Sequence, residues 1–230
     1  MGSEASDPAG VLHLVATPIG NLGDITYRAV EILKSADLIA CEDTRRSKIL
    51  LDHYGIHKPL VSYHDFSERK KTPGLIAEIK NGKKVALISD AGTPGIADPG
   101  YRLVRAAIEN GIKIEALPGP SAVLAALVVS GLPTDRFAFE GFLPVKSGAR
   151  EKKLLSLKEE ERTVIFYESP HRLLKSLEAI RQTIGDTPLV IARELTKKFE
   201  EVFRGTALEA LKYFSEKKIL GEFVILIHVK

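Results

Sequence analysis

Several features that mark other classes of protein are missing from this sequence. Cysteine occurs once in 230 residues, at Cys41, which excludes an intramolecular disulfide and a multi-cysteine metal site and makes a reducing cytoplasm the expected compartment. No apolar run approaches the ~20 residues that span a bilayer, so we expect no membrane segment. The first ten residues carry neither a basic flank nor an apolar stretch, so we predict a disordered lead-in rather than a secretory signal.

An excess of one charge is also missing. The 33 Lys and Arg residues nearly balance the 30 Asp and Glu residues, and the net charge of +3 permits local contact with nucleic acid without requiring it. The G-x-x-x-x-G-K-[ST] pattern of P-loop phosphoryl transfer is absent. The loop after the first predicted strand has only Gly20 and Gly23 of the glycines in a dinucleotide fingerprint, which argues against a diphosphate cradle.

The order of apolar and polar segments predicts an α/β fold with two lobes. From Val11 to about Ser130, short apolar runs alternate with amphipathic segments, which is the pattern of βαβ units in a parallel sheet. Beyond the turn-forming residues 131–134, some predicted strands follow one another without a helix between them, which implies antiparallel pairs in a mixed sheet. We therefore expect a parallel-rich N-terminal lobe over residues 11–132, a mixed C-terminal lobe over residues 133–230, and a cleft between them.

The loop Ser89–Gly100 is the clearest candidate for a ligand site. It follows the apolar run Val85–Ile88 and holds three glycines, two prolines and two aspartates in twelve residues, more than a plain strand-to-helix turn needs. Two further loops, residues 17–24 and 117–122, have the same position after other predicted strands. Ligands of open α/β sheets bind at the carboxyl ends of strands, so the three loops together predict a ligand site, although each alone could be an ordinary turn.

Charged residues follow the second predicted strand. Glu42 and Asp43 could supply a base, and Arg45 and Arg46 could bind phosphate as a fork. In the alternative, Asp43 only caps the next helix and the arginines are solvated. The pair His64-Asp65 is either an acid/base pair or, as is more common for a loop histidine, part of the surface.

A second charged group follows a predicted strand of the C-terminal lobe. Ser169 and Pro170 are predicted to be the N-cap and the first residue of the next helix. Capping leaves the nearby charges unexplained, so Glu168 is a third candidate base. Arg172 and Arg193 join the candidate clamps for phosphate or ribose.

Seven ordered segments together resemble one known family. They are residues Leu14–Thr26, Cys41–Arg45, Ser89–Pro99, Pro118–Ala122, Phe139–Pro144, Phe166–Arg172 and Ala192–Lys197. Their motifs are similar to those of the bacterial small-subunit ribosomal RNA (cytidine 2′-O)-methyltransferases, which belong to the tetrapyrrole methylase superfamily. The resemblance spans about residues 11–229. It implies two α/β lobes with a cofactor cleft between them that binds S-adenosylmethionine, and methylation of a cytidine ribose in the decoding region.

The resemblance also implies which residues contact the cofactor. They are Pro18, Asp90, Ala91, Gly92, Thr93, Ile96, Ala97, Ser121, Ala122, Tyr167, Ala192, Leu195, Gly221, Glu222 and Phe223. The sequence departs from the family pattern at Ala97, where serine is usual, and at His64-Asp65-Phe66-Ser67-Glu68, where the family resembles His-Glu-His-Asn-Glu. Many members continue into a basic helical tail, whereas this sequence ends at Lys230.

The same resemblance implies a cytoplasmic homodimer that acts on small-subunit ribosomal RNA without a metal or a membrane partner. Glu42, Asp43 and Glu168 stay open as the base that removes the 2′-hydroxyl proton. A methyltransferase for a small tetrapyrrole-like molecule is the alternative, but it needs a wide apolar trough, which the charged segments 42–46 and 168–172 argue against. A non-catalytic RNA-binding module is the second alternative, and the intact ligand loops argue against it.

Overall fold

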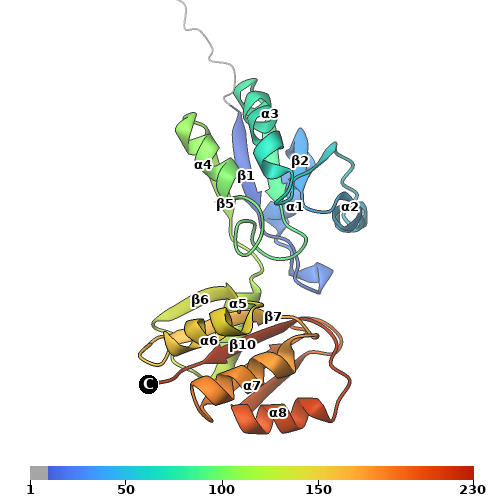
Figure 1. Ribbon diagram of the computed structural model, residues 1–230. Helices are drawn as coiled ribbons and strands as arrows, with labels where there is room; N and C mark the ends of the chain where they lie inside the picture. Colours follow the sequence, from blue (N-terminus) through green and yellow to red (C-terminus); the bar gives the residue numbers. More distant parts are fainter. Residues whose placement is uncertain (1–9) are drawn as a thin grey trace, which may run out of the picture. The chain divides into compact units, whose positions relative to one another are not determined.

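The computed structural model describes residues 10–230 and divides after Ser121 into two compact units (Figure 1). We refer to residues 10–121 as the N-terminal unit and to residues 122–230 as the C-terminal unit. The predicted lead-in lies outside the described residues except for Gly10, which is buried just before the first strand.

The N-terminal unit is a doubly wound parallel sheet. Its elements are β1 (Val11–Val15), η1 (Leu22–Asp24), α1 (Tyr27–Ser35), β2 (Leu38–Cys41), α2 (Thr44–His53), β3 (Leu60–Ser62), α3 (Glu68–Lys80), β4 (Lys84–Ile88), α4 (Tyr101–Glu109) and β5 (Lys113–Leu117). The strands lie in the order β3-β2-β4-β1-β5, and each neighbouring pair is parallel. The predicted alternation of strands and helices is therefore confirmed.

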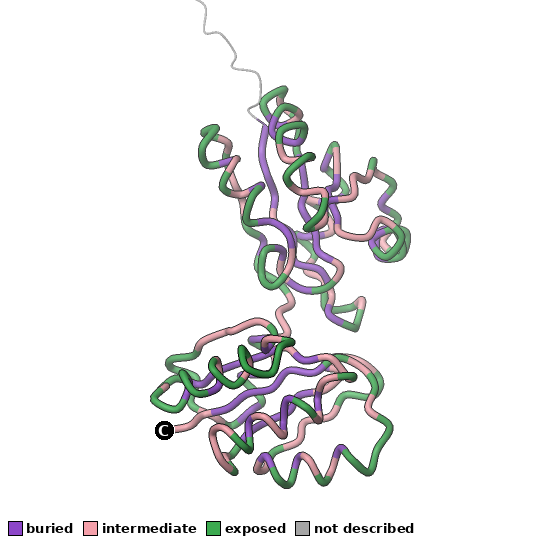
Figure 2. Tube along the Cα trace, in the orientation of Figure 1, coloured by how far each residue is buried: buried purple, intermediate pink, exposed green. Residues whose placement is uncertain are grey.

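Helices cover both faces of this sheet. On one face α1 and α2 contribute Leu33 and Leu51 to a cluster that includes Val15. On the other face α3 and α4 contribute Ile79 and Leu103 to a second cluster. Successive side chains of a strand point to opposite faces, so strands covered on both sides appear as continuous apolar runs. Figure 2 shows the three central strands, β1, β2 and β4, largely buried and the outer helix surfaces exposed.

The topology brings the loops that follow the strands to one edge of the sheet. All strands are parallel, so the carboxyl ends of β1, β2, β4 and β5 lie at the same edge. Cys41, the last residue of β2, pairs with Ile88, the last residue of β4. The segments beginning at Glu42 and at Ser89 therefore leave the sheet side by side.

The C-terminal unit contains a mixed sheet. Its elements are α5 (Ala122–Ser130), β6 (Phe137–Phe142), α6 (Ser147–Leu155), β7 (Thr163–Glu168), α7 (Leu173–Thr183), β8 (Pro188–Arg193), β9 (Glu201–Thr206), α8 (Ala207–Ser215) and β10 (Phe223–Ile227). The strand order is β6-β7-β10-β8-β9. Strand β6 pairs in parallel with β7 and the remaining pairs are antiparallel, which confirms the predicted mixed sheet.

Helices α6, α7 and α8 share one core cluster with this sheet, to which they contribute Leu154, Leu177 and Phe214. Helix α5 contacts β8, β9 and β10 and buries Val123 and Leu127. Because α5 packs on the C-terminal sheet, the division of the chain falls before this helix and not at residue 132, where the sequence placed it.

One predicted helix boundary is wrong. Helix α7 begins at Leu173 rather than at Pro170, and its N-cap is Arg172 without a side-chain capping bond. The Ser169 carbonyl accepts hydrogen bonds from the backbone N–H groups of Arg172 and Leu173, so a turn precedes the helix. The Glu168 carboxylate, which accepts hydrogen bonds from the Ser169 N–H and the Ser176 hydroxyl, organises this turn.

Candidate functional site

Hydrogen bonds join the predicted ligand loops of the N-terminal unit. Thr17 and Gly92 exchange two backbone hydrogen bonds with N···O distances of 2.8 and 2.9 Å, and the Thr17 hydroxyl donates to the Ser89 carbonyl at 3.1 Å. The Thr93 hydroxyl donates to the Pro120 carbonyl at 3.2 Å. The structure thus brings the loops after β1, β4 and β5 together, as the sequence predicted. The proposed cofactor contacts within these loops are Pro18, Asp90, Ala91, Gly92, Thr93, Ile96, Ala97 and Ser121.

The loop after β4 offers exposed backbone rather than long polar side chains. Ala91, Gly95, Ile96 and Ala97 are exposed along it. Gly92 has φ +85°, a left-handed conformation that favours glycine. Ala97 adopts φ +60° without being glycine, which costs roughly 1–2 kcal/mol. A loop of small residues in this conformation lets its backbone N–H and C=O groups approach a ligand closely.

Glu42 and Asp43 are neighbours in the sequence, but their pKa values shift in opposite directions. The Asp43 carboxylate caps α2 by accepting the backbone N–H of Arg45 at 2.8 Å, and it binds the Arg45 guanidinium through both oxygens. Hydrogen bonds from the side chain and backbone of Arg45 lower the pKa of Asp43 to about 2. Burial, followed by repulsion from Asp90 and Asp65, raises the pKa of Glu42. A lowered pKa makes a weak base, so Glu42 is the better proton acceptor.

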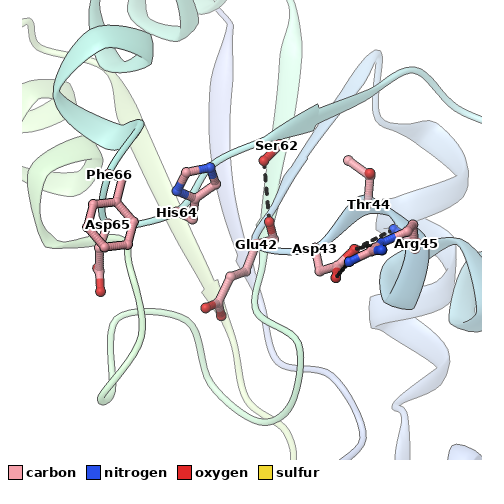
Figure 3. A pocket seen from close by; sticks show the side chains of 8 residues that line it. All are labelled: Glu42, Asp43, Thr44, Arg45, Ser62, His64, Asp65 and Phe66. Atoms are coloured by element: carbon pink, nitrogen blue, oxygen red, sulfur yellow. Dashed lines mark hydrogen bonds and ion pairs between the residues drawn. The ribbon is translucent and has the colours of Figure 1, made fainter.

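A polar pocket of about 410 Å³ opens beside Glu42 (Figure 3). This volume falls in the range of ~300–1,000 Å³ that small ligands occupy. The pocket is lined by Glu42, Asp43, Thr44, Arg45, Ser62, His64, Asp65 and Phe66. The structure therefore brings the candidate pair His64-Asp65 to the same pocket as Glu42. This charged lining is unlike the wide apolar trough that a tetrapyrrole-like macrocycle needs.

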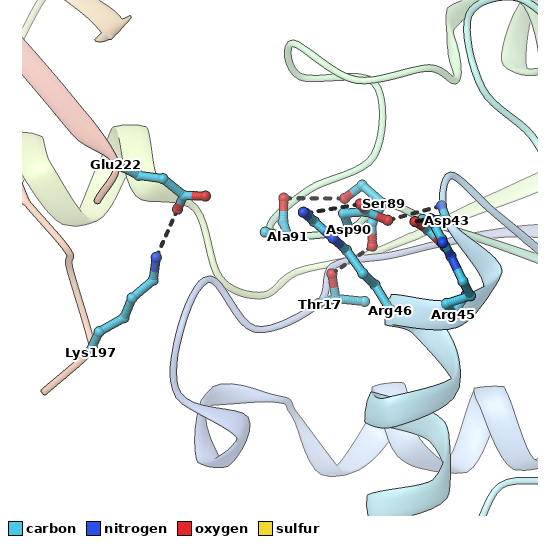
Figure 4. A network of polar contacts seen from close by, with 9 residues as sticks. All are labelled: Thr17, Asp43, Arg45, Arg46, Ser89, Asp90, Ala91, Lys197 and Glu222. Atoms are coloured by element: carbon cyan, nitrogen blue, oxygen red, sulfur yellow. Dashed lines mark hydrogen bonds and ion pairs between the residues drawn. The ribbon is translucent and has the colours of Figure 1, made fainter. Parts of the chain in front are cut away.

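Asp90 ties the loop after β4 to the start of α2 (Figure 4). Its Oδ1 accepts the backbone N–H of Asp43 at 3.0 Å, and its Oδ2 lies 3.3 Å from Nη1 of Arg46. The alignment of Cys41 with Ile88 in neighbouring strands places these segments next to each other. Asp90 therefore holds two of the converging loops in a fixed relation.

Asp98 is a site residue that the sequence analysis missed. It is half-buried in the loop after β4, and burial together with repulsion from Glu42 raises its pKa to about 6. Asp90 and Asp65 raise it further, so these carboxyl groups form one interacting cluster. The loop composition indicated two aspartates, but nothing in the sequence indicates that Asp98 interacts with Glu42 of another loop. Among residues 10–230, no group of His, Cys, Asp and Glu has the arrangement of a metal site.

Glu168 belongs to the interior of the C-terminal unit, where its side chain has no exposed surface. Its Oε1 accepts the backbone N–H of Ser169 at 2.8 Å, and its Oε2 accepts the Ser176 hydroxyl at 2.5 Å. The Arg172 Nε lies 3.4 Å from Oε1. Glu168 and Arg172, whose charges helix capping did not explain, therefore stabilise the start of α7.

The four predicted arginine clamps fall into two groups. Arg172 and Arg193 each donate to a backbone carbonyl and pair with a glutamate of the C-terminal unit, and their side chains are largely buried. Arg45 and Arg46 have 89% and 70% of their side-chain surface exposed. Of the four, the second pair has guanidinium surface available for a substrate phosphate.

Strand register groups three positions of the C-terminal sheet. Val224 of β10 lies between Tyr167 of β7 and Ala192 of β8, so these side chains share one face. Phe223 is the adjacent position, and its ring points into the core, where it packs edge-to-face against Phe214. A ligand on the face of Tyr167 and Ala192 would meet Phe223 only through its backbone.

Glu194 locks the segment that precedes β10. Its carboxylate accepts the backbone N–H of Glu222 at 3.0 Å and the Lys197 ammonium at 2.8 Å. Gly221 has φ +94°, and a Cβ placed there would lie 2.4 Å from Cγ of Glu194. The segment therefore needs glycine at this position. Leu195, which is buried, follows Glu194 directly, so three of the predicted cofactor contacts lie on these two adjoining segments.

The sequence matches the profile of the tetrapyrrole (corrin/porphyrin) methylases over residues 11–211. It is 52% identical over 219 residues to the ribosomal RNA small subunit methyltransferase I of Synechocystis sp., covering 95% of this chain and 78% of that protein. It is 48% identical over 221 residues to the protein of the same name from Thermotoga maritima, covering 96% of this chain and 99% of that protein.

Solved structures give the same fold. A diphthine synthase superposes with a TM-score of 0.78 at 17% identity, covering 96% of this chain and 90% of that chain. A uroporphyrin-III-C-methyltransferase from Thermus thermophilus gives a TM-score of 0.66 at 21% identity, covering 96% and 95%. Within residues 10–230, no helix is long and apolar enough to cross a membrane. The matched profile and the relatives of about 50% identity show that this chain belongs to the tetrapyrrole methylase family, in its ribosomal RNA small subunit methyltransferase I group.

Proposed function

We propose that this protein is an S-adenosylmethionine-dependent methyltransferase that modifies the 2′-hydroxyl of a cytidine in the decoding region of small-subunit ribosomal RNA. The observation that carries the proposal is the identity of about 50%, over nearly the whole chain, with proteins named ribosomal RNA small subunit methyltransferase I. The cytidine and the 2′-hydroxyl follow from the motif resemblance. The polar pocket beside Glu42 supports a hydroxyl substrate.

The residues at the carboxyl edge of the N-terminal sheet fit this cofactor. When bound, S-adenosylmethionine supplies a methyl group activated by a sulfonium cation. Glu42 and Asp98 have raised pKa values because they are half-buried near other carboxyl groups, and a nearby cation relieves that repulsion. The exposed backbone of residues 91–97 would bind the polar groups of the methionine part. Tyr167, Ala192 and the segment 221–223 are the residues expected around the adenine.

Glu42 is the base in this proposal. It removes the proton of the 2′-hydroxyl and so makes the oxygen nucleophilic, a role that contributes about 10²–10⁴-fold in other enzymes. Asp43 is already bound to Arg45, and Glu168 is buried under the first turn of α7. Arg45 and Arg46 are exposed beside the pocket, where a guanidinium fork can hold a backbone phosphate of the RNA.

The function is tested with labelled S-adenosylmethionine and under-methylated small ribosomal subunits. The expected result is label in the RNA that is recovered as 2′-O-methylcytidine after digestion to nucleosides. Label in a porphyrinoid but not in RNA would overturn the proposal in favour of a small-molecule methyltransferase. RNA binding without transfer of label to either substrate would instead indicate a non-catalytic RNA-binding module.

The base is tested with Glu42→Gln, which is expected to lower kcat by ~100-fold or more while the protein still binds RNA. Glu109→Gln on α4 is the matched control, because this glutamate is exposed and its ion-pair partner among residues 10–230 is Arg105 of its own helix. Asp43→Asn is the comparison within the pocket. A larger loss in Asp43→Asn than in Glu42→Gln would assign the base to Asp43.

The family relationship also supports a homodimer in the cytoplasm, where ribosomal RNA is found. Helix α5 consists of apolar residues up to Ser130, and Val128 on it is 73% exposed. Apolar helix surface of this kind fits contact with a second copy of the chain. Light scattering after size-exclusion chromatography should give twice the chain mass, and a monomer at micromolar concentration would contradict the proposal.

A further inference from the structure

Phe66 is the most exposed large apolar side chain among residues 10–230, with 97% of its surface accessible. It lies at the rim of the polar pocket that contains Glu42. A phenyl ring that is fully hydrated adds nothing to the core. We infer that this ring is the platform on which a nucleobase of the RNA substrate stacks, so that Phe66 is a positioning residue of the proposed reaction. The inference rests on the proposed function and extends it to substrate recognition.

The turn that carries Phe66 is held by several hydrogen bonds. The His64 carbonyl accepts the backbone N–H groups of Ser67 and Glu68, both at 2.8 Å, and the Ser67 hydroxyl accepts the His64 N–H at 3.0 Å. The Glu68 carboxylate accepts a hydrogen bond from Arg102 of α4 at 2.5 Å. The His64 ring meets the Phe66 ring edge-on, with centroids 6.2 Å apart. The turn therefore presents the ring to solvent in a defined position.

The groups along the pocket follow the order of the parts of a nucleotide. Figure 3 shows Phe66 and His64 at one end, Arg45 at the other, and the Glu42 carboxylate between them. An aromatic ring binds a base by stacking, a carboxylate accepts a ribose hydroxyl, and an exposed guanidinium binds phosphate. A nucleotide whose base lies on Phe66 would extend its ribose toward Glu42 and its phosphate toward Arg45.

The surroundings of Phe66 favour a base over an apolar protein surface. Its sequence neighbours Asp65, Ser67, Arg69 and Lys70 are polar or charged, and Phe66 is the one apolar residue among those that line the pocket. A nucleobase matches such a site because it combines an apolar face with polar edges. Loss of one stacking contact between a base and an aromatic side chain lowers RNA affinity by roughly 10-fold.

The kinetic test compares Phe66→Ala, Phe66→Leu and Phe66→Tyr on under-methylated small subunits. We expect the alanine and leucine variants to raise the KM for RNA by roughly 10-fold without changing the KM for S-adenosylmethionine, and tyrosine to restore it. Tyr27→Ala is the matched control, since Tyr27 of α1 is 93% exposed and does not line the pocket. A wild-type KM in Phe66→Ala would overturn the inference. A wild-type KM in Phe66→Leu would also overturn it, because any apolar contact, such as one with a ribosomal protein, would then suffice.

The absence of tryptophan from the sequence permits a direct test of stacking. Phe66→Trp and Tyr27→Trp each introduce a single tryptophan, whose selectively excited emission is followed while a short single-stranded cytidine-rich oligonucleotide is added. Stacking is expected to quench the emission of the first variant and not that of the second. Unchanged emission of Phe66→Trp under conditions where filter binding shows the oligonucleotide bound would overturn the inference.

The two proposals fail in different ways. If wild-type protein transfers no label to RNA while Phe66→Trp is still quenched, the proposed reaction is wrong and the stacking platform stands. If RNA is methylated with the same KM by every Phe66 variant, the platform is wrong and the reaction stands.

Discussion

Replacing Asp98 by asparagine is expected to stabilise the N-terminal unit at neutral pH. Burial and the charge of Glu42 raise the pKa of Asp98 from 3.8 to about 6. Above that pH the native state holds a carboxylate that is less favourable there than in the unfolded chain. Asparagine has nearly the same shape without the charge, so Asp98→Asn removes this unfavourable contribution.

The difference between a pKa of 3.8 and one of about 6 corresponds to about 3 kcal/mol. Asp98 is only half-buried, and solvent screening reduces the expected gain to ~1.5 kcal/mol. The native state binds more protons than the unfolded chain between about pH 4 and 6, so the wild type loses stability as the pH rises through this window. The advantage of Asp98→Asn is therefore complete above pH 6 and small at about pH 4.

Urea unfolding of wild type and Asp98→Asn at about pH 8, 6 and 4 measures this advantage directly. Cys41 is the only cysteine and is buried in the N-terminal unit, so its rate of reaction with a thiol reagent near pH 8 reports the opening of that unit. Glu31→Gln, at an exposed position of α1, is the control and should show no pH-dependent gain. Equal or lower stability of Asp98→Asn near pH 8, or a gain that persists at about pH 4, would refute the reasoning.

Three further substitutions test other contacts. Glu168→Gln weakens a fully buried network and should lower the free energy of unfolding by ~3 kcal/mol, measured by urea unfolding; a neutral result would contradict the structural role given to Glu168. Gly221→Ala places a methyl group 2.4 Å from Glu194 Cγ at a positive φ, so it should cost at least ~1 kcal/mol and weaken cofactor binding measured by calorimetry. Asp90→Ala removes the acceptor for the backbone N–H of Asp43 and should weaken cofactor binding by roughly 10-fold; unchanged affinity would show that the site lies elsewhere.

The fold of the N-terminal unit could be predicted because each signal was local. Strands covered on both faces appear as apolar runs, and parallel connections bring their carboxyl ends to one edge whatever the details of packing. The start of α7 could not be predicted in this way. A local capping rule selected Ser169, whereas the turn is organised by Glu168 through the Ser176 hydroxyl, which lies eight residues along the chain.

The candidate site was predictable in its location but not in its chemistry. Glu42, Asp43 and Glu168 all stand at strand ends, so position alone could not rank them. Their differences arise from neighbours that pattern analysis does not reveal, such as Arg45 against Asp43 and the carboxyl cluster around Glu42. Asp98 was missed for the same reason, since its raised pKa depends on a residue of another loop.

The carboxyl groups of the two units differ in a way that separates structural from functional roles. Glu168 and Glu194 are surrounded by donors, so removing their charge weakens the fold. Glu42 and Asp98 are half-buried among other carboxyl groups, so they reduce stability in the absence of a cationic partner. Such unfavourable placement is maintained at sites that bind ligands. Glu168→Gln and Asp98→Asn each remove one negative charge, but the first is predicted to lower the free energy of unfolding and the second to raise it. Measuring both variants therefore tests where the functional site lies without an activity assay.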